Sequence, residues 1–105
     1  SSIAGYNSIG SNLVYCAAKS GVNSLTKSFA RILAPNIRVN GIAPGLTKTD
    51  MTSSGSKKYY DEQTLITPLG RIAEPKDIAN VAFSIASDMT FVNGKTIVVD
   101  GGRLS

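Results

Sequence analysis

The sequence contains no histidine and no tryptophan, and it has one cysteine. Without histidine, the chain cannot build a histidine-based catalytic triad or most zinc centres, so we expect no metal site. One cysteine excludes an internal disulfide. Cys16 stands among small residues. It suits packing better than reactive-thiol chemistry, because no histidine is present to activate it.

Long hydrophobic runs and clusters of one charge are also missing. No apolar stretch approaches the ~20 residues of a membrane span, and no signal-peptide pattern opens the chain. We therefore expect a cytoplasmic protein with no membrane partner. The net charge is +4, but the basic residues are scattered, and Lys57-Lys58 is their one adjacent pair. A solvated surface explains this charge better than a nucleic-acid interface.

The chain has 105 residues and begins with Ser1 rather than methionine. This length allows one small domain at most. We therefore expect a piece of a longer protein.

Helical periodicity is the strongest pattern that is present. Between Asn12 and Ala34, apolar residues recur at spacings of three and four, which predicts a helix. Asn12 is the expected N-cap, and Pro35 should end the helix. The apolar positions of this helix are Val14, Ala18, Val22, Leu25, Phe29 and Ile32.

Short strands and two further helices are predicted after this helix. Residues 1–11 read as a strand end followed by a loop, residues 36–43 as a strand ended by Pro44-Gly45, and residues 57–66 as a short helix. A helix starting at Pro75 should end near Ser87-Asp88 and bury Ile78, Val81, Ala82 and Ile85. Residues 95–99 are continuous and β-branched, which is typical of a strand covered on both faces, and Asp100-Gly101-Gly102 should form its terminating turn. This order predicts an α/β fold with parallel strands, at the end of a larger sheet.

Tyr15 and Lys19 are four residues apart on the long helix, so their side chains should leave the same face. An ammonium beside a phenol favours loss of the phenolic proton, which suits proton exchange with an alcohol. Ser2 lies thirteen positions before Tyr15. The alternative for Tyr15 and Lys19 is a surface pair without a chemical role, and the alternative for Ser2 is an ordinary loop hydroxyl.

Several motifs in order resemble the C-terminal portion of the short-chain dehydrogenase/reductase family. They are Ser1-Ser2-Ile3-Ala4-Gly5, Tyr15-Cys16-Ala17-Ala18-Lys19, the run from Ile37 to Thr49, the run from Arg71 to Ala79, and Asn93-Gly94 with Val99-Asp100-Gly101-Gly102. The resemblance implies that residues 1–105 form the second half of a Rossmann-type, doubly wound parallel sheet. The first strands and the glycine-rich phosphate turn are absent from this sequence.

The resemblance also implies an activity and a set of roles. It implies interconversion of a secondary alcohol and a ketone with NAD or NADP. Tyr15 would be the acid/base, Lys19 its activator and ribose ligand, and Ser2 the donor to the substrate oxygen. Further cofactor contacts would come from the Pro44-Gly45 turn and from Leu46, Thr47 and Thr49. Turn capping is the alternative role of the two threonines.

The remaining implications concern the substrate loop and assembly. Residues 50–66 would form a substrate lid, with Met51, Tyr59 and Tyr60 as wall residues, although the tyrosines could simply pack. Members of the family are commonly dimers or tetramers, built from the long helix and from the last helix and strand, so a homo-oligomer is expected. The alternative is that this chain is a truncated, inactive fragment that acts at most as an interaction module.

Overall fold

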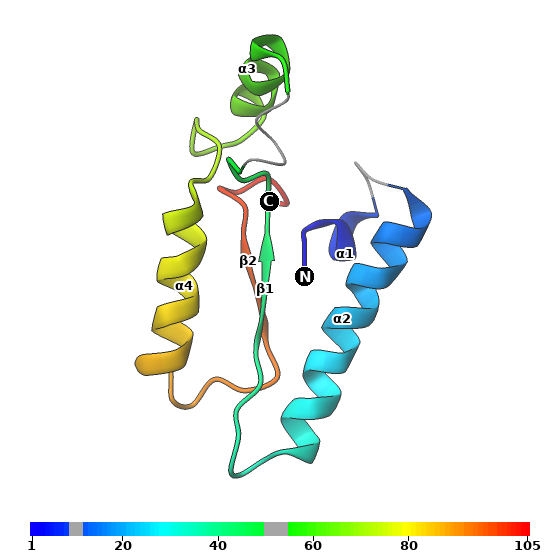
Figure 1. Cartoon of the computed structure of the whole chain (residues 1–105), viewed down its shortest axis with the longest axis vertical. Coiled ribbons are helices and arrows are strands. Elements are labelled where there is room, and N and C mark those ends of the chain that lie inside the picture. The colour runs from blue at the N-terminus through cyan, green and yellow to red at the C-terminus, as the bar shows by residue number, and fades with distance from the viewer. Residues whose placement is uncertain (9–11, 50–54) are drawn as a thin grey trace.

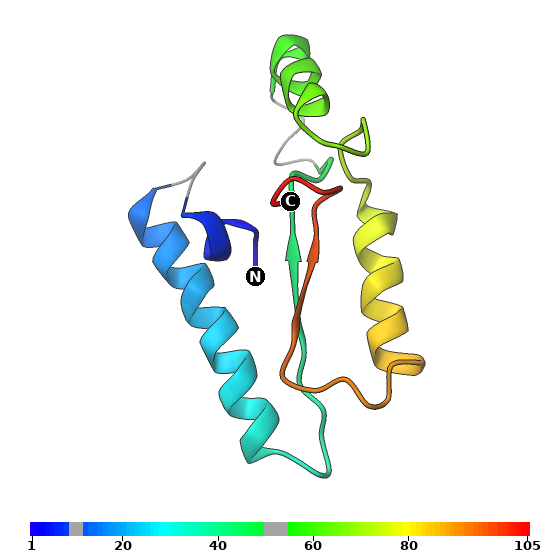
Figure 2. The same cartoon turned by 180° about the vertical axis from the view of Figure 1, so that it is seen from behind.

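The computed structural model describes residues 1–8, 12–49 and 55–105. Its elements, in order, are α1 (Ala4–Asn7), α2 (Leu13–Ile32), β1 (Gly41–Pro44), α3 (Lys57–Leu65), α4 (Pro75–Ser87) and β2 (Thr96–Val99). The strands are parallel, with Gly41 opposite Thr96 and Pro44 opposite Val99. Helices α2 and α4 lie on opposite sides of this sheet, and α3 stands beyond its carboxyl end (Figures 1 and 2). The predicted α/β arrangement with parallel strands is confirmed.

Helix α2 begins where its N-cap signal predicts. The Asn12 side chain accepts a hydrogen bond from the Tyr15 backbone N–H at 2.8 Å. The last helical residue is Ile32, two residues before the predicted end at Ala34. The buried residues of α2 are small, namely Cys16, Thr26 and Ala30. Two of them allow a close approach to β1 and to the turn before β2, because a Cβ added at Gly41 would lie 3.3 Å from the Thr26 Oγ1 and one added at Gly94 would lie 3.2 Å from the Ala30 Cβ.

The larger apolar residues of α2 point away from the described core. Phe29 is 47% exposed and Ile32 is 71% exposed. The buried hydrophobic residues of the described chain are Ala4, Cys16, Ala30, Ala43, Ile72 and Ile85. Small side chains dominate this core, so it buries little apolar surface for the length of the chain.

Strand β1 is shorter than predicted and is displaced toward Pro44. Residues 37–40 belong to no strand, and polar groups of residues 38–40 bond to the turn before β2 and to the end of α4. The Val39 N–H donates to Asn93 Oδ1 at 2.9 Å, and the Val39 carbonyl accepts from Gly94 N–H. These bonds replace a strand ladder at this point. Pro44 is the last residue of β1 rather than its breaker.

The first residues also differ from the prediction, because residues 4–7 form α1 instead of a loop. The Ile3 N–H donates to the Pro44 carbonyl at 3.1 Å. The segment that precedes α1 therefore lies beside the carboxyl end of β1.

Helix α4 matches the predicted bounds, but its buried face is narrower. Ile85 is buried and Ile78 and Val81 are half-buried, whereas Ala82 is exposed. Strand β2 is not covered on both faces, because Val98 is exposed. Among the described residues, no helix combines the length and apolar character needed to cross a membrane.

Candidate active site at the carboxyl end of the sheet

Tyr15 and Lys19 meet on the first turns of α2. The Lys19 Nζ lies 5.3 Å from the centroid of the Tyr15 ring, and Tyr15 is 40% exposed. The i, i+4 spacing produces this contact, and the Asn12 cap fixes the turn that carries Tyr15. A phenol and an ammonium thus lie together at an accessible position, and both can donate hydrogen bonds to a bound molecule.

The segment that carries Ser2 packs against the same turns of α2. The Ser1 hydroxyl donates to the Lys19 carbonyl at 3.2 Å, and the Ser20 hydroxyl donates to the Gly5 carbonyl at 2.9 Å. Glycine is required at position 5, because an added Cβ would lie 3.0 Å from the Lys19 backbone. The Ser2 Oγ accepts from the Ala4 N–H at 3.2 Å, which leaves the hydroxyl proton able to donate elsewhere.

The predicted cofactor-contacting residues follow β1 directly. The Gly45 N–H donates to the Val99 carbonyl at 2.9 Å, and a Cβ at Gly45 would lie 3.0 Å from the Asp100 Cα. Gly45 thus permits close approach of the two strand ends. The Thr47 hydroxyl donates to the Gly45 carbonyl at 3.1 Å, so at least this threonine caps its own turn. Thr49 is exposed two residues further on.

Two backbone hydrogen bonds hold this segment against the loop before α4. The Ala73 N–H donates to the Leu46 carbonyl at 3.2 Å, and the Lys48 N–H donates to the Ala73 carbonyl at 2.9 Å. The Lys48 ammonium also pairs with the Glu74 carboxylate at 2.8 Å. The segment after β1 is therefore anchored to the loop before α4, whereas α2 lies on the other side of the sheet (Figure 1).

Helix α3 carries the two tyrosines of the predicted lid. Ser56 caps it by accepting from the Tyr59 N–H at 3.1 Å. The Tyr59 and Tyr60 rings contact each other edge to face, with centroids 5.7 Å apart. They lie beyond the carboxyl end of the sheet, whereas Met51 lies outside the described residues.

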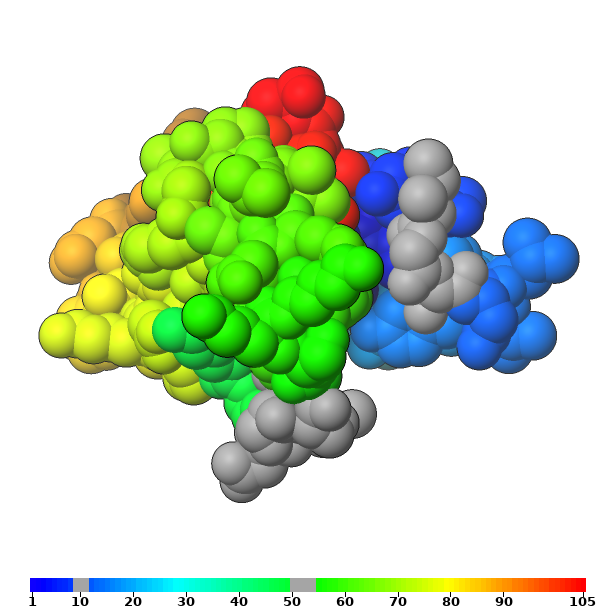
Figure 3. All heavy atoms as spheres, turned by 90° about the horizontal axis from the view of Figure 1, so that it is seen from above, coloured from blue at the N-terminus to red at the C-terminus, as the bar shows by residue number. Residues whose placement is uncertain are grey.

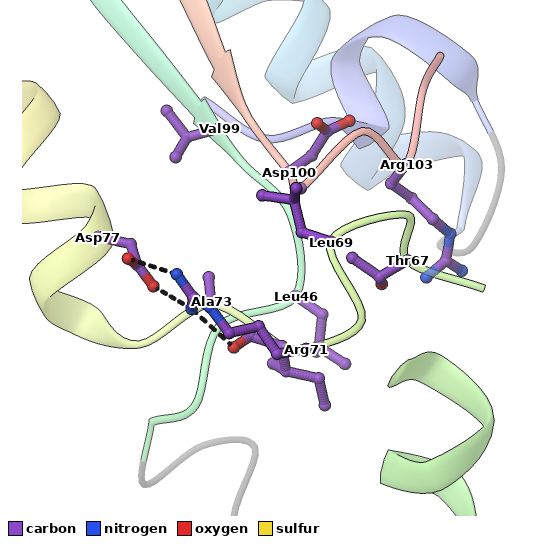
Figure 4. A pocket seen from close by; sticks show the side chains of 11 residues that line it. Leu46, Thr67, Leu69, Arg71, Ala73, Asp77, Val99, Asp100 and Arg103 are labelled. Atoms are coloured by element: carbon purple, nitrogen blue, oxygen red, sulfur yellow. Dashed lines mark hydrogen bonds and ion pairs between the residues drawn. The ribbon is translucent and has the colours of Figure 1, made fainter. Parts of the chain in front are cut away.

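The structure contains a pocket of about 120 Å³ beside Leu46 that the sequence did not predict. Its lining includes Leu46, Thr67, Leu69, Val99, Asp100 and Arg103 (Figure 4). These residues come from the end of β2 and from the segments after β1, α3 and β2. The signal that could have revealed their meeting is the paired glycine at 101–102, which allows the chain after β2 to turn closely.

An ion pair closes one side of the pocket. The Arg71 guanidinium bonds to both Asp77 carboxylate oxygens, at 2.6 and 2.9 Å. The Asp77 carboxylate also accepts from the Glu74 N–H at 2.8 Å. The pKa of Asp77 is lowered to about 2. The hydrogen bond from Arg71 contributes most to this shift, and the hydrogen bond from the Glu74 backbone contributes next. This pair caps the start of α4, and we assign it no chemical role in the site.

Known proteins match both the sequence and the structure. A family model described as enoyl-(acyl carrier protein) reductase matches residues 1–103. A 3alpha-hydroxysteroid dehydrogenase of Mediterraneibacter gnavus is 47% identical over 93 residues, which are 87% of this chain and 37% of that protein. The chain therefore spans well under half of this curated relative.

Solved structures agree with the sequence matches. A short-chain dehydrogenase/reductase of Brucella melitensis, described as a glucose/ribitol dehydrogenase, superposes with a TM-score of 0.90 at 42% identity, over 98% of this chain and 42% of that one. A small-chain dehydrogenase in complex with NADPH superposes with a TM-score of 0.87 at 33% identity, over 99% of this chain and 48% of that one. Sequence, fold and motif order thus agree that the chain belongs to the short-chain dehydrogenase/reductase family of oxidoreductases.

Proposed function

We propose that the complete protein carrying this sequence interconverts a secondary alcohol and a ketone, using NAD or NADP. Residues 1–105 would form the C-terminal part of its single Rossmann-type domain. The observation that carries the proposal is the contact of the Lys19 Nζ with the Tyr15 ring, 5.3 Å from its centroid, on the accessible face of α2.

In this proposal, the side chains of Ser2, Tyr15 and Lys19 each have a separate role in proton transfer. In ketone reduction, the Tyr15 hydroxyl would give its proton to the substrate oxygen, and in alcohol oxidation the phenolate would take that proton. The Lys19 ammonium would stabilise the phenolate. The Ser2 hydroxyl would donate a hydrogen bond to the same substrate oxygen, orienting it toward Tyr15.

The residues present fit the nicotinamide end of a dinucleotide cofactor. Ligands of parallel α/β sheets bind at the carboxyl ends of the strands, where Pro44, Gly45, Leu46, Thr47 and Thr49 follow β1. The Lys19 ammonium offers donors to ribose hydroxyls. When bound, the nicotinamide supplies or accepts the hydride.

Substitution of Tyr15 by phenylalanine tests this function in the complete protein. Tyr15→Phe keeps the ring but removes the transferable proton, so activity should fall by about 10²–10⁴-fold, the usual contribution of general acid–base catalysis. Tyr6→Phe is the matched control, because the Tyr6 hydroxyl bonds to the Thr96 carbonyl. Full activity of Tyr15→Phe would refute the assignment.

A second proposal concerns the 105-residue chain by itself. We propose that it is inactive alone and acts at most as an interaction module, because its sequence holds no glycine-rich phosphate turn and the apolar face of α2 is exposed. Titration with NADPH, followed by cofactor fluorescence, should show no micromolar binding. Micromolar binding with turnover would overturn this proposal without affecting the first.

The exposed apolar face of α2 also suggests how the complete protein assembles. We propose that the complete protein forms a homo-oligomer, a dimer or tetramer, through α2 and through α4 with β2. The exposed apolar side chains of α2, together with Phe83 of α4 at 72% exposure, support this proposal.

A further inference from the structure

Helix α3 has little contact of its own with the rest of the molecule. It buries no residue, and its half-buried side chains, Tyr60, Gln63 and Thr64, share one helical face at i, i+3 and i+4 spacing. Figure 1 shows α3 standing away from the sheet and the other helices. Among the described residues, the contacts that orient α3 are therefore those made along this face and at its base.

Those bonds lead to the residues that follow β2. The Arg103 guanidinium donates to the Gln63 Oε1 at 3.0 Å, and both groups are partly buried. The Leu69 N–H donates to the Gly101 carbonyl at 3.1 Å, just below the helix. The C-terminus lies at the carboxyl end of the sheet, the end at which α3 stands (Figure 1), and the C-terminal residues are visible in the view from above (Figure 3).

The turn at residues 100–102 is shaped to receive the base of α3. Gly101 and Gly102 have φ values of +65° and +90°, which favour glycine. A Cβ at Gly101 would lie 2.8 Å from the Thr67 Cγ2, closer than atoms can pack. The Asp100 carboxylate holds the turn by accepting from the Gly102 and Leu104 N–H groups.

The same turn contacts the candidate cofactor segment, since Gly45 approaches the backbone of Asp100. Residues 100–103 therefore connect the end of β1 with α3. We propose that residues 100–103 act as a latch for the lid helix, with Arg103 and Gln63 as positioning residues that set the orientation of α3 and hence substrate entry. The effect on substrate rests on the proposed function, whereas the latch itself is a structural statement.

Hydrogen exchange in the complete protein tests the latch directly. Arg103→Met removes the donors but keeps an unbranched stem close to the aliphatic part of arginine, so amides 57–65 should exchange about threefold to tenfold faster, the loss expected for one such bond. Gln63→Met, which removes the acceptor, should match it. Gln63→Glu turns this charge-assisted bond into an ion pair and should slow exchange. Arg31→Ala on α2 is the control, with no change expected in α3.

Steady-state kinetics then separate the latch from a merely structural role. Arg103→Met and Gln63→Met should raise KM for the alcohol or ketone about threefold while kcat stays within about twofold, and Arg103→Lys should restore part of the loss. Unchanged exchange in 57–65 would overturn the latch even if the enzyme is active. Faster exchange in Arg103→Met and Gln63→Met, together with no dehydrogenase activity in the wild-type protein, would instead refute the proposed function and leave the latch standing.

Discussion

Helices α2 and α4 flank the same two strands, yet they use their faces in opposite ways. Helix α4 buries Ile85, and Arg38 bonds to the carbonyls at its C-terminal end. Helix α2 approaches the sheet through Thr26 and Ala30 and leaves its large apolar side chains exposed. The C-terminal end of α4 is therefore held within this chain, and Phe83 is its exposed large apolar side chain, whereas α2 leaves most of its large apolar side chains exposed, which calls for a further partner.

The largest expected effect concerns that second face of α2. In the complete protein, Phe29→Ser should lower the free energy of unfolding by about 3 kcal/mol, because a covered phenylalanine loses its burial and leaves a cavity. Denaturant unfolding, together with light scattering for the oligomeric state, checks this expectation. Lys27→Ser on the same helix is the control. An unchanged unfolding energy and unchanged assembly would mean that nothing covers this face.

The next effect concerns the C-terminal end of α4, where Arg38 bonds to backbone carbonyls. Arg38 donates to the carbonyls of Ile85, Ala86, Met89 and Val92, at 3.0, 3.1, 2.9 and 3.3 Å. Arg38→Met would leave these acceptors without their charged donor and should cost about 2 kcal/mol of unfolding free energy. Thermal unfolding measures the loss. A loss below about 0.5 kcal/mol would place α4 stability elsewhere.

The smallest effect is a difference in how stability depends on pH between the first turn of α4 and the first turn of α2. The pKa of Asp77 is lowered to about 2, so its contribution to stability is complete above the unfolded pKa near 4 and disappears as pH falls toward 2. Unfolding of Asp77→Asn should therefore depend less on pH between 4 and 2 than that of the wild type.

A cap without a titrating group provides the contrast at α2. Asn12→Ala removes the bond to the Tyr15 N–H and should cost about 1 kcal/mol, equally at pH 3 and pH 6. If Asp77→Asn retained the full acid dependence of the wild type, the α4 start would not be the acid-sensitive end.

Local signals predicted the elements well, and cross-chain contacts explain the misses. Asn12, Pro35 and Pro75 mark helix ends through backbone chemistry that acts within a turn, so the bounds of α2 and α4 followed closely. The start of β1 depends on the Asn93 side chain, which bonds to the Val39 N–H from 54 residues away. No periodicity within residues 36–43 carries that information.

The candidate site divides in the same way. The Tyr15–Lys19 contact follows from helical spacing, and its geometry was foreseeable. The close approach of Gly45 to Asp100, and the Arg103–Gln63 bond, were not. The roles of Ser2, Tyr15 and Lys19 remain predictions for the experiments above.

By itself, the sequence determined the starts of α2 and α4, the parallel α/β order and the placing of a phenol beside an ammonium, because capping and helical spacing are local. Tertiary structure decided which face of α2 meets the sheet, where β1 begins, and that the turn after β2 supports α3. These depend on close approach at Gly41, Gly94 and Gly101, where a missing side chain lets side chains from distant parts of the sequence reach the backbone.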